Sequence, residues 1–190
     1  AGQVLKGFEI TDSISDGLLK IDGKITGTGL KEVTKTNILI ENFGVKDAPL
    51  FTQILNATSL VGLVNTLRGK GIRFQTLRAD VDFTPNKIEI KDSFASGTSL
   101  GISTEGAIDR NSDQISIKGM IVPAYILNRI IDQIPVVGRI LTGGKKEGLL
   151  AAEYLISGTR DEPEVSVNPL TAFTPGFLRA FVKATRKPLE

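Results

Sequence analysis

Apolar and polar residues alternate along most of this chain with a period of two, the pattern of strands that are buried on one face. Leu19, Ile21 and Ile25 share one such face, and residues 1–10 and 31–45 also read as extended. Short turns then separate a meander of four further predicted strands at 71–83, 87–94, 97–109 and 114–122. The parity of the first of these switches near Gln75-Thr76, which predicts a β-bulge there.

Helical spacing interrupts this alternation between the second and third predicted strands. Asp47 is placed to cap a first helix that has Pro49 in its first turn. A second helix is expected after Thr58 or Ser59, and Gly69 and Gly71 end it. Further along, a Pro-started helix (123–134), strands at 149–157 and 164–167 and a last helix at 177–187 are expected.

These elements predict an α+β fold in one domain over residues 1–190. Its centre would be a bent, mostly antiparallel β-sheet, shaped like a groove or taco, with helical insertions and a C-terminal amphipathic helix. Glycines recur inside the predicted strands at 97, 101, 106 and 119, which favours a strongly bent sheet over a flat one.

Composition narrows the possible functions. The chain has no His and no Cys, so thiol chemistry, Ser-His nucleophile pairs and His/Cys metal sites are excluded. A net charge of +2 is too small to indicate nucleic acid as a partner. No cofactor is implied, and a non-enzymatic binding or structural role is favoured. A hydrolase that uses carboxylates alone stays open, although the acids stand in turns such as 109–113 and 161–164.

The second half of the chain resembles the C-terminal region of AsmA-like proteins of the bacterial envelope. The resemblance covers roughly the last 80 residues and rests on an ordered series of short motifs. They are Ile117-Lys118-Gly119, Val122-Pro123-Ala124, Leu127-Asn128, Ile134-Pro135-Val136-Val137-Gly138, Leu141-Thr142-Gly143-Gly144, Glu147-Gly148-Leu149, Tyr154-Leu155-Ile156-Ser157-Gly158, Pro163-Glu164-Val165, Val167-Asn168-Pro169-Leu170 and Pro175-Gly176-Phe177-Leu178-Arg179.

The resemblance implies a bridge-like lipid transporter, anchored in the inner membrane by an N-terminal helix that this chain lacks. In such proteins a long β-groove extends through the periplasm, and its apolar inner face is thought to carry phospholipid acyl chains toward the outer membrane. The chain opens at AGQVLKGFEI without an initiator Met and is therefore expected to be a segment of a longer protein. The resemblance supplies no catalytic residues and no motif for the binding site.

Two groups of residues are candidates for lipid contact. The parity of the central strands predicts a groove face, although the same residues would equally form an ordinary core against the helices; they are Ile88, Ile90, Leu100, Ile102, Ile115 and Ile117. The last helix has an apolar side opposite a basic side, typical of a helix lying on an anionic membrane or docked on the sheet; its candidate contacts are Phe177, Arg179, Phe181, Lys183 and Arg186. The alternative function is a protein-interaction module of the envelope with a closed core.

Overall fold

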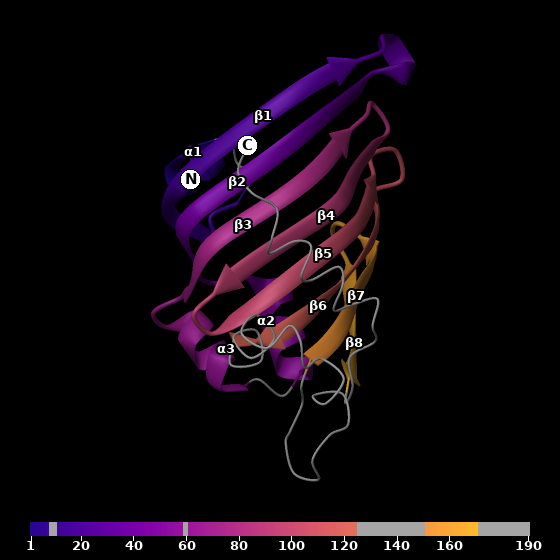
Figure 1. Cartoon of the computed structure of the whole chain (residues 1–190). Helices are drawn as coiled ribbons and strands as arrows, with labels where there is room; N and C mark the ends of the chain where they lie inside the picture. The colour runs from indigo at the N-terminus through magenta and orange to yellow at the C-terminus, as the bar shows by residue number, and fades with distance from the viewer. Residues whose placement is uncertain (8–10, 59–60, 125–150, 171–190) are drawn as a thin grey trace, which may run out of the picture.

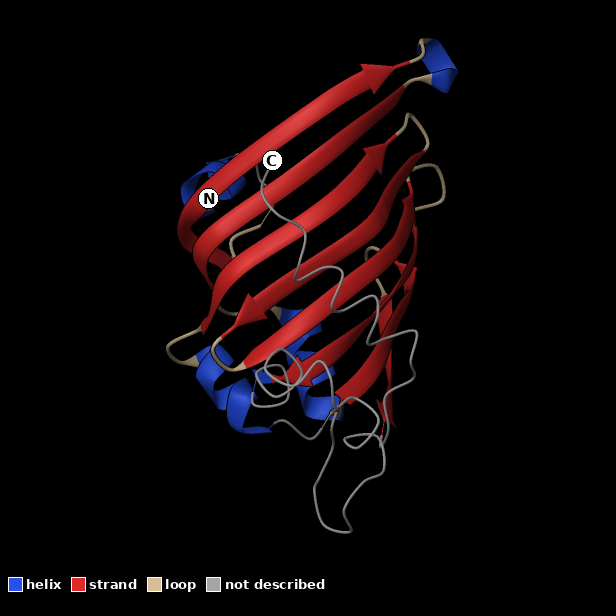
Figure 2. Ribbon diagram, viewed as in Figure 1, coloured by secondary structure: helices blue, strands red, loops and turns tan. Residues whose placement is uncertain are grey.

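The fold is an open antiparallel β-sheet of eight strands that neighbour one another in chain order (Figures 1 and 2). It was obtained as a computed structural model that describes residues 1–7, 11–58, 61–124 and 151–170. The strands are β1 (Ile14–Thr26), β2 (Val33–Val45), β3 (Ile72–Phe83), β4 (Lys87–Gly97), β5 (Leu100–Asp109), β6 (Gln114–Pro123), β7 (Ala151–Thr159) and β8 (Pro163–Leu170).

Three short helices accompany the sheet in the described part of the chain. They are α1 (Gly2–Gly7), α2 (Pro49–Ala57) and α3 (Val61–Arg68), and a 3-10 turn, η1 (Gly29–Lys31), closes the β1–β2 hairpin. The expected helical pair between the second and third strands is confirmed as α2 and α3. The expected strand over residues 1–10 is wrong, because Gly2–Gly7 forms α1 and Leu5 packs against the core.

The predicted Asp47 cap is also wrong. Ala48 is the N-cap of α2 and makes no side-chain capping bond, while Pro49 is in the first turn as expected. Asp47 instead has a left-handed backbone, with φ +50°, and its carbonyl oxygen accepts a hydrogen bond from the Ser13 hydroxyl. Asp47 stands one residue before the N-cap, in a left-handed conformation that Asp tolerates, and its carboxylate lies 3.9 Å from Lys46 Nζ.

The sheet curls so that its two halves enclose one face. The α2–α3 pair connects β2 to β3, yet α2 also contacts β8 at the far side of the sheet. In Figure 1 the pair lies at one end of the strands, while β7 and β8 turn away from the plane of β1 to β5. We call the face that α2 and α3 cover the inner face, and the opposite one the outer face.

A crease across three strands keeps apolar side chains on the inner face. Ile40 and Phe43 in β2 are both in the core although their spacing is odd, and Asn42 between them has φ +55°. Opposite it in β1, Gly17 has φ +82°. In β3 the crease falls at Gln75, where the register with β4 shifts, which confirms the predicted bulge.

A second irregularity, in β4, also keeps apolar side chains on the inner face. The register shifts on both sides of this strand between Ile90 and Ser93, so Lys91 and Asp92 occupy the space of one residue. Ile90 and Ser93 consequently face inward together, and the two charged residues remain on the outer side. Bulges of this kind also increase the local bend of a sheet.

The Tyr154 side chain links three neighbouring strands in the middle of the inner face. It pairs with Gly119 of β6, and its hydroxyl lies 2.7 Å from Thr104 Oγ1 and donates to the Ser103 carbonyl oxygen at 2.8 Å. The ring therefore spans from β7 to β5, which only a residue without a side chain at position 119 allows. Around it, the core comprises Ile40, Phe43, Ile54, Leu55, Val64, Leu67, Ile72, Phe74, Ala95, Leu100, Ile115, Ile121, Ala152 and Ile156.

The later predicted strands are confirmed as β7 and β8, with ends that differ by up to three residues. Pro123, expected to begin a helix, ends β6 instead. The rest of that helix and the C-terminal amphipathic helix lie outside the described residues.

We predict that Gly119→Ala destabilises the fold by about 1–3 kcal/mol, because a Cβ there would overlap the Ser103 carbonyl oxygen and the Tyr154 hydroxyl. Gly62→Ala is the matched control. Gly62 is exposed in α3 with nothing near its Cβ position, so its substitution should be neutral or stabilise by up to about 1 kcal/mol. Urea unfolding measures both, and equal effects would contradict the packing of Tyr154 on Gly119.

Burial raises the pKa of Tyr154 to about 12, from its ordinary value of 10.0. Because the folded state resists ionisation, its contribution to stability is complete below pH 10 and is lost between about pH 10 and 12. Over that window we expect the free energy of unfolding to fall by roughly 2–3 kcal/mol more than in Tyr154→Phe. Unfolding curves at increasing alkaline pH test this; parallel losses in both proteins would show that Tyr154 is not buried.

Candidate functional site

The inner face is a continuous surface without charge. Following the strand register from β1 to β8, four rows of paired residues begin at Leu19, Ile21, Gly23 and Ile25. These rows contain no Lys, Arg, Asp or Glu. Their polar members are few, and Thr36 and Ser93 among them are buried. The described strands thus present one face made of aliphatic side chains, the aromatic rings of Phe83 and Tyr154, glycine, proline and a few small polar groups.

All six predicted face residues lie on this inner face. Ile88 pairs with Ile108, Ile90 with Gly106, and Ile102 with Ile121. Ile115 and Ile117 pair with Ile108 and Gly106 in the same two rows, and Leu100 pairs with Pro123 near α2 and α3. The register therefore brings these residues together on one side, as the parity of the sequence predicted.

Exposure divides the inner face into two parts. Near α2 and α3 the side chains are covered: Leu100 is 0% exposed and Ile72 is 1% exposed. Toward the other end and the β1 edge they are open, with Ile21 at 58% and Ile25 at 65%. Between these limits, half-buried residues form a gradient; they are Ile38, Leu77, Ile88, Ile90, Ile102, Ile108, Ile117, Val165 and Val167. We call the less covered region the open part of the inner face.

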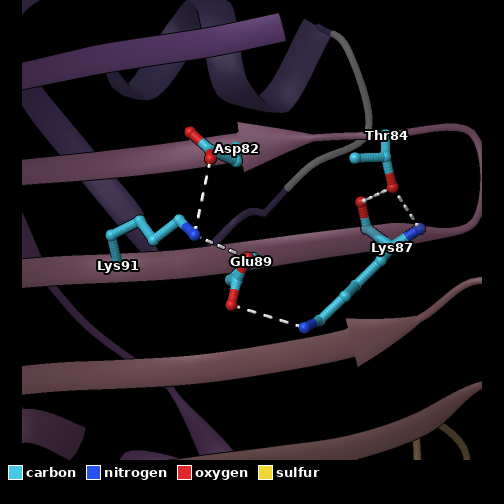
Figure 3. A network of polar contacts seen from close by, with 5 residues as sticks. All are labelled: Asp82, Thr84, Lys87, Glu89 and Lys91. Carbon is cyan, nitrogen blue, oxygen red and sulfur yellow. Dashed lines mark hydrogen bonds and ion pairs between the residues drawn. The ribbon is translucent and has the colours of Figure 1, made fainter. Parts of the chain in front are cut away.

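Charged residues gather on the outer face. Figure 3 shows a network on β3 and β4 in which Lys91 Nζ lies 3.5 Å from Asp82 and 2.8 Å from Glu89, and Lys87 Nζ lies 3.4 Å from Glu89. Further pairs join Lys20 to Glu41 and Lys118 to Glu105. These are solvent-exposed pairs that contribute little to stability individually. The outer face is not exposed throughout, because Leu39, Phe94 and Val122 also lie on it and are buried.

Glu89, Lys91 and Lys118 on this face have pKa values shifted chiefly by hydrogen bonds to their partners, and burial acts in the opposite direction. Hydrogen bonds from Lys91 and then Lys87 lower the pKa of Glu89, and Glu89 in turn raises the pKa of Lys91. Glu105 raises the pKa of Lys118 in the same way. Each shift favours the charged form, which is the opposite of what a general acid or base near neutral pH requires.

The remaining candidates are placed as follows. In the described part of the chain, no group of three or more Asp or Glu residues could hold a metal ion, and no helix is long and apolar enough to cross a membrane. The acid at Asp109 accepts backbone hydrogen bonds from Asn111 and Ser112 in the β5–β6 turn, as turn acids do. The terminal-helix residues Phe177, Arg179, Phe181, Lys183 and Arg186 lie outside the described residues.

The prediction from sequence missed part of the open face. Ile21 and Ile25 share the predicted apolar face of their strand but were not among the predicted groove residues, and Ile38 lies directly beside Ile21 in the register. A signal existed for Ile38, since it shares the parity of Ile40. Pairing partners, however, depend on the register between strands, which the alternation of one strand does not give.

Comparison with known proteins returned no match: no family model, no curated protein and no solved structure is similar to this chain.

We predict that the two parts of the inner face differ in their effect on stability. Leu100→Ala should cost about 2–5 kcal/mol, since it leaves a cavity in a fully covered site. Ile21→Ala should cost less than about 1 kcal/mol, because most of that side chain stays in water when the chain folds. Denaturant unfolding distinguishes them. A cost at Ile21 as large as that at Leu100 would mean that the inner face is a closed core.

Proposed function

We propose that the open part of the inner face binds the acyl chains of phospholipids. The observation behind this proposal is the combination of four uncharged rows across eight strands with apolar side chains that are still 58% and 65% exposed. Leaving apolar surface in water costs roughly 25 cal/mol per Å² relative to burial, so such a face favours an apolar occupant.

Acyl chains fit this surface better than a protein partner does. Protein interfaces concentrate their binding energy in Trp, Tyr and Arg anchors, surrounded by hydrogen-bonding rims. The most exposed inner-face residues are isoleucines, and Tyr154 is buried with its hydroxyl already bonded. A hydrocarbon chain needs no hydrogen-bond partners, and a row of Ile side chains can contact it along its length.

This role agrees with the resemblance to AsmA-like proteins. On that reading the chain is one segment, with a bent β-groove in an α+β domain, of a longer periplasmic protein anchored in the inner membrane. It would support phospholipid movement between the two membranes and the integrity of the outer membrane, without catalysis. The basic terminal helix would contact a membrane surface or an envelope protein.

A second candidate rests on the covered part of the face. Leu55, Leu67 and Leu100 are each 0% exposed, so one end of the inner face is filled by protein. If the whole face were closed in this way in solution, the domain would be an interaction module without a lipid ligand.

The test is to purify the chain from bacteria, extract it and quantify phospholipid by mass spectrometry. The double variant Ile21→Asp/Ile25→Asp places charge on the open part, and we expect bound lipid to fall by about tenfold, since an unpaired carboxylate does not tolerate contact with hydrocarbon. The matched control is Leu18→Asp/Leu155→Asp. Leu18 and Leu155 are 56% and 42% exposed on the outer face, so this control changes charge equally.

The control variant should retain the lipid of the unmodified chain. Lipid loss in both variants, or no lipid on the unmodified chain, would overturn the proposal and favour the interaction module. Circular dichroism of each variant confirms that the sheet is intact.

A further inference from the structure

The free edge of β1 is a long unpaired strand. β1 bonds to β2 over twelve residue pairs, from Ile14 with Val45 to Thr26 with Val33. On its other side, no strand among the described residues pairs with it. Edge strands expose backbone donors and acceptors that can pair with another chain, so proteins usually shorten or protect them. At 13 residues β1 is not short.

Helix α1 protects only the beginning of this edge. The amino group of Ala1 donates to the Gly17 carbonyl oxygen, and a Cβ at Gly2 would lie 2.6 Å from the Ile14 carbonyl oxygen. α1 therefore occupies the space beside residues 14–17. No described strand pairs with this edge over residues 18–26, and this segment contains Ile21 and Ile25, the two most exposed large apolar residues of the described inner face.

The available segment is complementary to itself. Its sequence is Lys20-Ile21-Asp22-Gly23-Lys24-Ile25. Asp22 and Lys24 lie two residues apart on the outer face, and Ile21 and Ile25 lie four residues apart on the inner face. When two such strands run antiparallel about a twofold axis at Gly23, Asp22 stands opposite Lys24 of the partner subunit. Ile21 then stands opposite Ile25 of the partner subunit. Symmetry repeats both contacts.

We propose that a second copy of this chain pairs with β1 in this register. Opposite charges and aliphatic pairs directly across antiparallel strands are stabilising. Among the described residues Asp22 and Lys24 have no ion pair within the chain, so both are available to a partner. The pairing also gives Ile21 and Ile25 an apolar neighbour on the inner face.

Other symmetric registers fit less well. An axis at Asp22 would place two Asp22 carboxylates opposite each other, and like charges across strands are destabilising. An axis at Ile21 would align Lys20 with Asp22 of the partner subunit, but it would bring the partner's Thr26 beside Asp16, where α1 packs. The register centred on Gly23 places no like charges opposite each other. Its paired segments are residues 20–26 of each copy, so β1 of one copy does not extend beside residues 14–17 of the other.

This pairing has a consequence for the sheet. A twofold axis perpendicular to the sheet at Gly23 places both inner faces on the same side, so the uncharged surface continues from one copy into the other. The contacts of this dimer lie between two β1 strands, so dimerisation does not depend on lipid binding.

A single introduced cysteine tests the register. Gly23→Cys places a thiol on the twofold axis, where the two Cα atoms of facing residues are about 4.5–5.5 Å apart, within disulfide range. The nearest heavy atom to a Cβ at this position is Thr36 Oγ1 at 3.8 Å, so the side chain is accommodated. The chain has no cysteine of its own. Under mild oxidation we expect a covalent dimer on a non-reducing gel, and none for Ile21→Cys, whose two copies would be offset by four residues.

Charge variants test the partner's identity. Asp22→Lys gives two lysines facing each other across each contact, and Lys24→Asp gives two carboxylates. Each variant alone should raise the dissociation constant of the dimer at least about tenfold in analytical ultracentrifugation. An equimolar mixture of the two restores opposite charges in both contacts and should associate as tightly as the unmodified chain. Both variants leave the inner face unchanged, so a failure here is distinct from a failure to bind lipid.

Dimerisation of the unmodified chain, cross-linking through Gly23→Cys and rescue by mixing would together support the proposal. A chain that remains monomeric at its highest soluble concentration would overturn it. So would cross-linking through Ile21→Cys in place of Gly23→Cys, since that result requires a different register.

Discussion

The structure depends on keeping charge to one face of a continuous sheet. A charged side chain on the inner face would lack both water and a partner near α2 and α3, at a cost of several kcal/mol. If the strands had no irregularities, a charged side chain would face inward wherever the sequence departs from period two. The left-handed residues Gly17 and Asn42 and the bulges at Gln75 and Lys91-Asp92 correct these departures. The same irregularities bend the sheet, so the separation of charge and the curvature have one origin.

Period-two alternation was sufficient to predict the strands and the face on which the apolar residues lie. It also located the bulge at Gln75, since Phe74 and Leu77 cannot share a face otherwise. It missed the equivalent switch at Asn42, where the odd spacing of Ile40 and Phe43 was the available signal. It also predicted an extended conformation for Gly2–Gly7, because six residues with two apolar positions fit either period.

Features that depend on distant contacts could not be predicted in this way. That α2 reaches β8 follows from the accumulated curl of the sheet, which no single strand encodes. This contact determines which part of the inner face is covered and which is open. Sequence parity therefore placed six residues on one face, but it could not separate Leu100, which is fully buried, from Ile90, which is half-buried. The inner face is therefore covered by α2 and α3 at one end and exposed toward β1, whose outer edge is not paired with any described strand.

The most direct measurement of acyl-chain binding is methyl NMR of the isoleucine- and leucine-labelled chain, with a phospholipid that has a nitroxide on its acyl chain. Paramagnetic broadening reports which methyl groups lie near the hydrocarbon. We expect strong broadening of Ile21, Ile25, Ile88 and Ile90 on the inner face, with Leu18 and Leu155 on the outer face unaffected. Equal broadening of both faces, or none at the inner-face isoleucines, would contradict acyl-chain binding by the inner face.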